Sequence, residues 1–363
     1  MHKYSAAFLI YQVYCGGVPM KKNLLSATAT FMAAAILMFS AGSAVHARTI
    51  RLTYSIFFPP THEQCKTGMM WAEEIEKQTD GAVTITVFPG GTLTKANQCY
   101  DGVEKGISDI GMSCFAYNRG RFPVMEAVDL PLGYPNGQTA THVANDFFQA
   151  LQPGELDGVK VLYIHAHGPG LLHTQRPVNS LADLKGMKIR STGLSAKVAE
   201  ALGAVPVAMP QPSTYEALQK GVVEGTFAPI ETLKGWRQAE VIKHTTDCRS
   251  IGYTTSMYVV MNLKKWNSLP KEIQDVFESV SNKWIDVHGS TWDRVDIEGK
   301  TYTQSLGNDI IELKPAEHQK WKAAVEPIIQ NYASEKSKKG IDGKHVISTL
   351  RSLIEKYSAV YVQ

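Results

Sequence analysis

Segments with a two-residue apolar period alternate with segments of helical period, and this alternation constrains the fold more than any other feature. Residues 48–55, 82–91 and 107–115 predict strands, whereas residues 62–81 and 95–106 predict helices. Strands that alternate with helices build α/β layers with parallel strands. We therefore expect one such layer in the first part of the chain.

The pattern then starts again. Strands are predicted at 158–167, 187–190 and 205–209, with helices at 193–204 and between Pro212 and Gly221. A second α/β unit follows from this repetition, so we expect two lobes.

The C-terminal part changes to a helical period. From Pro270 to residue 297 the apolar residues recur every 3.6 positions, with a bend expected at Gly289, and further helices are predicted at 316–334 and 345–357. A helix of this length exceeds what one lobe needs, so we expect it to lie across both.

Residues 20–47 have the plan of a secretory signal: two lysines, an apolar stretch, then small residues ending at Ala47. Residues 1–19 are interpreted as an upstream extension. The alternative is a membrane anchor, but the apolar run is shorter than the ~20 residues that a bilayer requires. We expect cleavage after Ala47 and a periplasmic or extracellular product.

Without this leader the chain carries 34 basic and 34 acidic side chains, because the leader has three lysines and no acid. The balance argues against nucleic acid as a partner. The four remaining cysteines include no C-x-x-C pair. In an oxidising compartment Cys65 and Cys99 are either a disulfide or free buried thiols.

The searched catalytic motifs are absent, including G-x-S-x-G, H-E-x-x-H and the phosphate-binding glycine loops. His165 and His167 alternate on one strand and face the same side, but two ligands without a third do not make a metal site. His173 is interpreted as structural. We expect no metal, no cofactor and no catalytic residue.

Arg190 ends a predicted strand, where open α/β sheets bind ligands. A guanidinium can hold both oxygens of a carboxylate or sulfonate through two parallel hydrogen bonds. The alternative is a structural ion pair with an acid such as Asp183.

The segment "NSLADLKGMKIRSTG", followed by "VPVAMPQPSTYEALQKGVVEGTFAPIE", closely resembles the signature of the substrate-binding proteins of TRAP transporters, the DctP type. The resemblance implies a bilobal periplasmic-binding-protein-like α/β fold, joined by hinge strands and a long spanning helix. Lobe 1 would comprise residues 48–167 and 256–297, and lobe 2 residues 168–255 and 298–363.

By the same resemblance Arg190 clamps the ligand anion. The other implied ligand-binding positions are Tyr54, Phe57, Cys114, Tyr117, Gln211, Phe227 and Glu231. Sialic-acid-type relatives place a second arginine roughly where Gly170 stands here. Its loss argues for a monoanion rather than a dianion.

The resemblance therefore implies a non-enzymatic, monomeric periplasmic receptor for a small organic anion, either a monocarboxylate or a sulfonate. Its partners would be the small DctQ-like and large DctM-like membrane subunits of the transporter. The alternatives are a secreted hydrolase or lyase on a two-lobe scaffold, or a ligand-sensing subunit of a receptor kinase.

Overall fold

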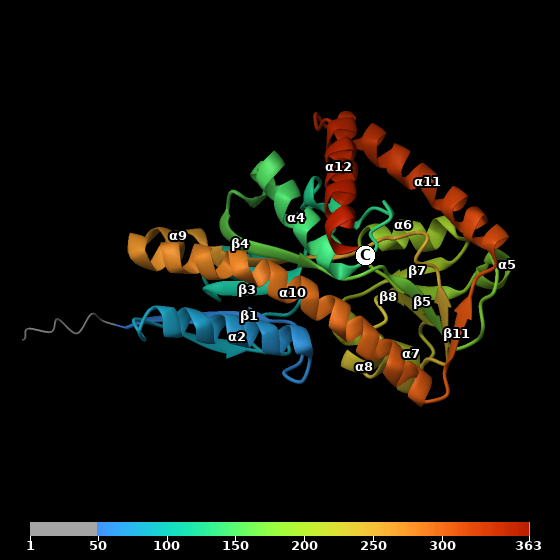
Figure 1. The fold of residues 1–363 in the computed structure, drawn as a ribbon, viewed down its shortest axis with the longest axis horizontal. Coiled ribbons are helices and arrows are strands. Elements are labelled where there is room, and N and C mark those ends of the chain that lie inside the picture. The colour runs from blue at the N-terminus through green and yellow to red at the C-terminus, as the bar shows by residue number, and fades with distance from the viewer. Residues whose placement is uncertain (1–48, 363) are drawn as a thin grey trace, which may run out of the picture. The chain divides into compact units, whose positions relative to one another are not determined.

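A computed structural model describes residues 49–362 as two β-sheets with helices packed around them (Figure 1). The proposed signal and its cleavage site after Ala47 lie outside the described residues. Within those residues, no helix combines the length and the apolar character that crossing a bilayer demands. The mixed α/β fold class expected from the sequence is confirmed.

The first sheet has five strands in the order β2-β1-β3-β10-β4. β1 pairs in parallel with β2 and β3, whereas β10 runs antiparallel to both β3 and β4. The strands are β1 (Ile50–Ile56), β2 (Val83–Phe88), β3 (Ile110–Cys114), β4 (Val159–Ala166) and β10 (Ser256–Asn262). The parallel strands expected in the first part of the chain are confirmed for β1, β2 and β3. The antiparallel pairs arise because the chain leaves this sheet through β4 and returns to it in β10.

The second sheet has six strands in the order β11-β9-β5-β8-β6-β7. Its β6 pairs in parallel with β7 and β8, while β5 is antiparallel to β8 and β9. The strands are β5 (Leu171–Thr174), β6 (Lys188–Ser191), β7 (Val205–Ala208), β8 (Gly225–Ala228), β9 (His244–Asp247) and β11 (Asp309–Glu312).

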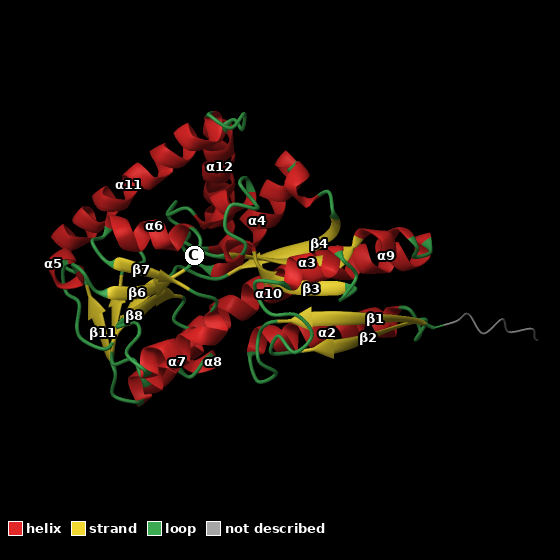
Figure 2. Cartoon of the chain, turned by 180° about the vertical axis from the view of Figure 1, so that it is seen from behind, coloured by secondary structure: helices red, strands yellow, loops and turns green. Residues whose placement is uncertain are grey.

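Helix α10 (Lys271–Ser305) is 35 residues long and packs against elements of both sheets. At 1.5 Å per residue it extends about 52 Å. It contacts α2 (Glu63–Gln78), α4 (Gly137–Leu151) and α8 (Thr232–Gly235), as Figure 2 shows from behind. The helix continues through Gly289, where a Cβ would come within 2.5 Å of Gln138. This glycine therefore permits the close approach of α10 and α4.

The remaining helices pack beside the two sheets or on other helices. They are α3 (Cys99–Glu104), α5 (Leu181–Leu184), α6 (Leu194–Ala201), α7 (Thr214–Gln219), α9 (Leu263–Asn267), α11 (Pro315–Ser337) and α12 (Gly343–Tyr361). α12 packs on α4, while α11 packs on α6, so the C-terminal helices touch elements next to both sheets. The exact lobe boundaries given above remain a prediction.

The four cysteines of residues 49–362 are free and buried, so the disulfide alternative for Cys65 and Cys99 is wrong. The two thiols belong to different apolar clusters, each packed among other core side chains. Burial raises the pKa of each to about 11. Both thiols therefore stay protonated and serve as small apolar packing groups.

Candidate functional site

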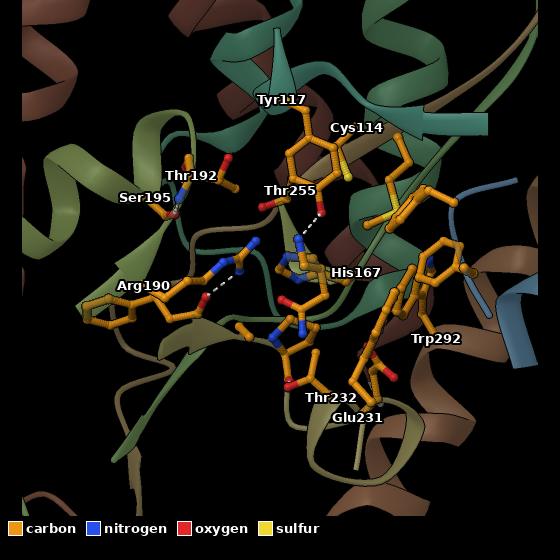
Figure 3. Close-up of a pocket in the computed structure, with 18 residues that line it drawn as sticks. Cys114, Tyr117, His167, Arg190, Thr192, Ser195, Glu231, Thr232, Thr255 and Trp292 are labelled. Carbon is orange, nitrogen blue, oxygen red and sulfur yellow. Dashed lines mark hydrogen bonds between the residues drawn. The ribbon is translucent and has the colours of Figure 1, made fainter. Parts of the chain in front are cut away.

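A cavity with about 410 Å³ of empty volume lies where the two sheets face each other (Figure 3). The first sheet contributes Phe57 and Phe58 after β1, and Cys114 at the end of β3. The second sheet contributes Arg190 on β6 and Phe227 on β8. Part of this space is open to solvent, and only about 40 Å³ of it can hold the centre of a water-sized molecule, which is less than a typical small-molecule site offers, so the walls lie close together.

Arg190 is the cation of this cavity and is only 4% exposed. Its Nε donates to the carbonyl of Met209 at 3.0 Å, and its Nη1 donates to the carbonyl of Phe227 at 3.4 Å. Among the described residues, no carboxylate oxygen lies within 4.0 Å of its guanidinium nitrogens. Asp183, the alternative partner, instead accepts hydrogen bonds from Asn179 and Ser180.

A buried charge without a counter-ion is costly, and this guanidinium has free donors towards the cavity. An anionic group entering the cavity would supply the missing partner. The geometry therefore fits an anion site better than a structural ion pair.

Uncharged donors lie near Arg190. The side-chain amide nitrogen of Gln211 is buried and has no partner within the described part of the chain. Thr192 and Ser195 also line the cavity and bond to each other, with the Ser195 hydroxyl donating to the Thr192 carbonyl at 2.7 Å. Gln211 thus offers a second donor for a bound head group.

The two walls touch beside the cavity. The backbone N–H of Gln211 donates to the Tyr117 hydroxyl at 3.2 Å, and the Thr192 hydroxyl donates to the Ala116 carbonyl at 3.3 Å. A Cβ on Gly193 would lie 2.8 Å from the Cβ of Ala116. These contacts hold the two walls together beside the cavity.

Aromatic rings form much of the remaining wall. The ring centroids of Phe57 and Phe58 are 4.1 Å apart, and Phe57 meets Tyr117 edge-on at 5.6 Å. Trp236 stacks on Phe57 at 6.2 Å, and Trp292 lies 6.1 Å from Phe58. Such a wall suits a flat or apolar ligand body.

Glu231 lies on the second-sheet side and is 2% exposed. Its Oε2 accepts a hydrogen bond from Nε2 of His62 at 2.9 Å, and its backbone N–H donates to Asp296 at 3.1 Å. Burial raises the pKa of Asp296 well above its ordinary value, and the nearby charge of Glu231 raises it further. The cavity thus contains one buried acid besides its buried cation.

His167 lines the cavity, whereas His165 and His173 do not. Burial lowers the pKa of His167 to about 4. The charge of Arg190 also lowers it, whereas the hydrogen bond to Gly168 raises it. Nδ1 of His165 accepts from Trp292, and His173 bonds to Thr245 and Ala228. Over residues 49–362, no three His, Cys, Asp or Glu side chains gather as a metal site requires.

Of the eight ligand-binding residues predicted above, seven line this cavity: Arg190, Gln211, Glu231, Phe227, Phe57, Cys114 and Tyr117. The structure does not bring Tyr54 to it. Tyr54 is buried in the core, edge-on to Trp71 at 5.6 Å. It shares one face of β1 with Leu52 and Ile56, and that face packs under α2.

Several lining residues escaped the sequence analysis, among them Thr192, Ser195, Trp236, Trp292 and Thr255. Thr192 and Ser195 directly follow the strand of Arg190, so the strand end was a usable signal. Trp292 was interpreted only as part of the apolar stripe of the long helix. Trp236 follows a four-residue helix, and nothing in the local pattern marked it.

The space near Gly170 is filled by Tyr253. A Cβ on Gly170 would lie 2.0 Å from the ring of Tyr253, and the Gly170 N–H donates to the Tyr253 carbonyl at 3.0 Å. A larger residue does not fit there. Arg176 is exposed and lies 3.7 Å from Glu224, so it gives the cavity no second cation.

Two α/β layers facing one small cavity, with an isolated guanidinium inside, define an architecture suited to binding a solute between two lobes. Comparison with known proteins agrees. The profile of "DctP: Bacterial extracellular solute-binding protein, family 7" matches residues 54–336. This chain belongs to that family, the substrate-binding proteins of TRAP transporters.

Three solved TRAP solute-binding proteins illustrate the similarity. One from Desulfovibrio salexigens, solved as an open complex, is 34% identical with a TM-score of 0.75, covering 85% of this chain and 97% of that chain. One from Rhodoferax ferrireducens, in complex with benzoate, is 26% identical with a TM-score of 0.82, covering 86% and 99%. One from Bordetella bronchiseptica, with bound mandelate, is 30% identical with a TM-score of 0.79, covering 85% and 99%.

Proposed function

We propose that this chain is an exported receptor that captures a small organic monoanion between its two sheets and delivers it to a TRAP membrane permease. The observation that carries the proposal is the guanidinium of Arg190, buried in the cavity without an acidic partner. Arg190 would take both oxygens of the ligand head group, with Gln211 adding a donor.

The preferred head group is a carboxylate on an aromatic or similarly flat body. The rings of Phe57, Phe58, Trp236 and Trp292 support this choice, as do the benzoate and mandelate bound by the two relatives. A sulfonate carries the same single negative charge and can accept the same pair of hydrogen bonds from the Arg190 guanidinium, so it is the second head group to test.

Capture and release require the walls to move apart, as in other hinged binding proteins. Separation would break the contacts of Tyr117 with Gln211 and of Ala116 with Thr192. Closure excludes water from around Arg190 and strengthens its attraction for the anion. The membrane subunits would recognise the closed, loaded form.

A thermal-shift screen against matched carboxylates, sulfonates and amides tests the site. A ligand at one hundred times its dissociation constant should stabilise the folded protein by about 2.7 kcal/mol. We expect Arg190→Ala to abolish the shift and remain folded, while Arg176→Ala, at an exposed position, keeps it. If Arg190→Ala leaves affinity within about threefold, or ~0.7 kcal/mol, the anion clamp is wrong.

Two further measurements test the remaining parts of the proposal. The bound acid should be recovered chemically unchanged after prolonged incubation, whereas a hydrolase or lyase would convert it. Uptake of the acid into vesicles that hold the two membrane subunits should depend on added receptor. Uptake that is independent of the receptor would refute delivery.

A further inference from the structure

A second charged group faces the cavity that contains Arg190. Figure 3 shows Arg190 and Glu231 on different sides of the pocket, and no nitrogen of Arg190 lies within 4.0 Å of the Glu231 carboxylate. The two charges therefore do not neutralise each other by direct contact. A ligand between them meets a cation at one end and an anion at the other.

His62 contacts Glu231 as a neutral donor. The backbone N–H of Gln64 donates to Nδ1 of His62 at 3.2 Å, so Nδ1 carries a lone pair and Nε2 carries the hydrogen. That Nε2–H donates to Oε2 of Glu231 at 2.9 Å. The hydrogen bond orients the carboxylate and leaves its negative charge in place.

The other oxygen of Glu231 accepts no hydrogen bond from any described residue. The side chain is nevertheless almost fully buried, with 3% of its surface exposed. This oxygen is not sealed off from solvent, unlike the amide nitrogen of Gln211, and it can accept at least two hydrogen bonds. A donor on the ligand would complete its coordination.

The backbone makes room for this pair. A Cβ on Gly235 would lie 2.6 Å from Oε2 of Glu231 and 2.7 Å from Nε2 of His62, so glycine allows the two side chains to meet. The ring of Phe58 lies 4.5 Å from that of His62, and Trp236 lies 5.5 Å from it. These rings pack against His62 and hold it beside the carboxylate.

We propose that the ligand carries a hydrogen-bond donor, a hydroxyl or an ammonium group, at the end opposite its carboxylate, and that Glu231 binds this donor. His62 is a positioning residue that orients Glu231 from the first-sheet side. The inference rests on the proposed function, because Arg190 must hold the carboxylate for the ligand to be placed in this direction.

The test uses matched pairs of acids: aromatic and aliphatic carboxylates with no donor, with a hydroxyl and with an aminomethyl group at the far end. Benzoate, 3- and 4-hydroxybenzoate, and 3- and 4-(aminomethyl)benzoate form the aromatic set. Hydrogen bonds to charged groups discriminate by about 10- to 100-fold, so a donor-bearing acid should bind that much more tightly than its parent. Whichever donor, the hydroxyl or the ammonium, gives the larger gain in affinity is the group that Glu231 binds in the ligand.

Glu231→Gln should reduce this ratio to below about threefold, because the amide loses the charge that attracts the donor. The matched control Glu216→Gln, at an exposed acid on α7, should leave the ratio unchanged. His62→Leu should lower the ratio, and His62→Gln, whose amide can still donate to Glu231, should restore most of it. A general loss of folding would not change this ratio selectively.

Each outcome is decisive. The inference is overturned if the tightest-binding acid of the wild-type protein loses nothing on removal of its donor, a result that needs no variant. It is also overturned if Glu231→Gln weakens parent and donor-bearing acids equally. If Arg190→Ala binds all acids as well as the wild type, the proposed function itself fails.

Discussion

The two walls of the cavity differ in chemistry. The first-sheet wall is mainly apolar and aromatic, with Phe57, Phe58 and Met257. The second-sheet wall contributes the charged Arg190 and Glu231, together with the amide of Gln211. We infer that the second-sheet wall selects the ligand head group, while the first-sheet wall supplies apolar contact area and seals the cavity.

This difference follows from where each strand ends. Phe57 and Phe58 leave β1 at its carboxyl end and fold over the cavity. Arg190 is still paired within β6, opposite Val207 and Thr226, and this pairing fixes its backbone. A guanidinium held in place by its strand can bind a head group while the opposite wall closes over the ligand, as the proposed function requires.

The largest effect is expected at Gly170, which packs directly against the ring of Tyr253 beside the second sheet. Gly170→Ala places a Cβ 2.0 Å from the ring of Tyr253, and the backbone hydrogen bond between the two residues prevents easy relief. We expect a loss of about 3 kcal/mol in the free energy of unfolding, measured by urea denaturation.

Gly154→Ala is the control, since Gly154 is exposed and its nearest neighbour is a carboxylate oxygen of Asp157 at 3.3 Å. Its unfolding free energy should change by less than about 0.5 kcal/mol. Equal stability of Gly170→Ala and the wild type would mean that the ring of Tyr253 can move away from the added Cβ.

The next effect separates charge from geometry at Arg190. Arg190→Lys keeps the positive charge but loses the planar fork and the bonds to Met209 and Phe227. Calorimetry should show carboxylate affinity falling by about 10- to 100-fold. The control Arg176→Lys should leave the carboxylate affinity unchanged. If Arg190→Lys also kept the full affinity, the positive charge alone, and not the planar guanidinium, would account for binding.

A smaller effect is expected on the first-sheet wall. Phe57→Leu keeps an apolar side chain but loses ring contacts with Phe58 and Tyr117, each worth about 0.5–1.5 kcal/mol. Affinity for an aromatic acid should fall about three- to tenfold, and the preference for the acid over its amide should not change. Phe148→Leu on α4, away from the cavity, is the control. An altered acid–amide preference would contradict the division between the walls.

The sequence predicted the elements that depend on local periodicity. The helical period from Pro270 onward became α10, and the first set of alternating elements became part of the first sheet. The strand predicted at 158–167 was grouped with the second set, but it forms β4 of the first sheet. Arg190 was found because a cation at a strand end is a local signal with a known geometric consequence. The sequence missed Trp236 and Trp292 because only the approach of α8 and α10 to the cavity gives them a role.

The same physics explains the failures. Tyr54 was predicted to bind ligand, yet its alternation with Leu52 and Ile56 places it on the buried face of β1. From β1, only Phe57 and Phe58, which follow the strand end, reach the cavity. The possible pairing of Cys65 with Cys99 rested on compartment alone, and spacing along a chain does not report which cluster a side chain joins.

The smallest expected effect is that of pH, and it tests whether Arg190 acts as a single cation. Burial lowers the pKa of His167 to about 4 from an ordinary 6.5, so this imidazole is neutral above pH 6. Protonation would add a positive charge beside Arg190 and tighten anion binding as pH falls. We therefore expect calorimetric affinity for a monocarboxylate to be constant within about twofold from pH 6 to pH 8. Tightening of tenfold as pH falls across this range, lost in His167→Asn, would show that His167 is a second cation and that the wall is suited to dianions.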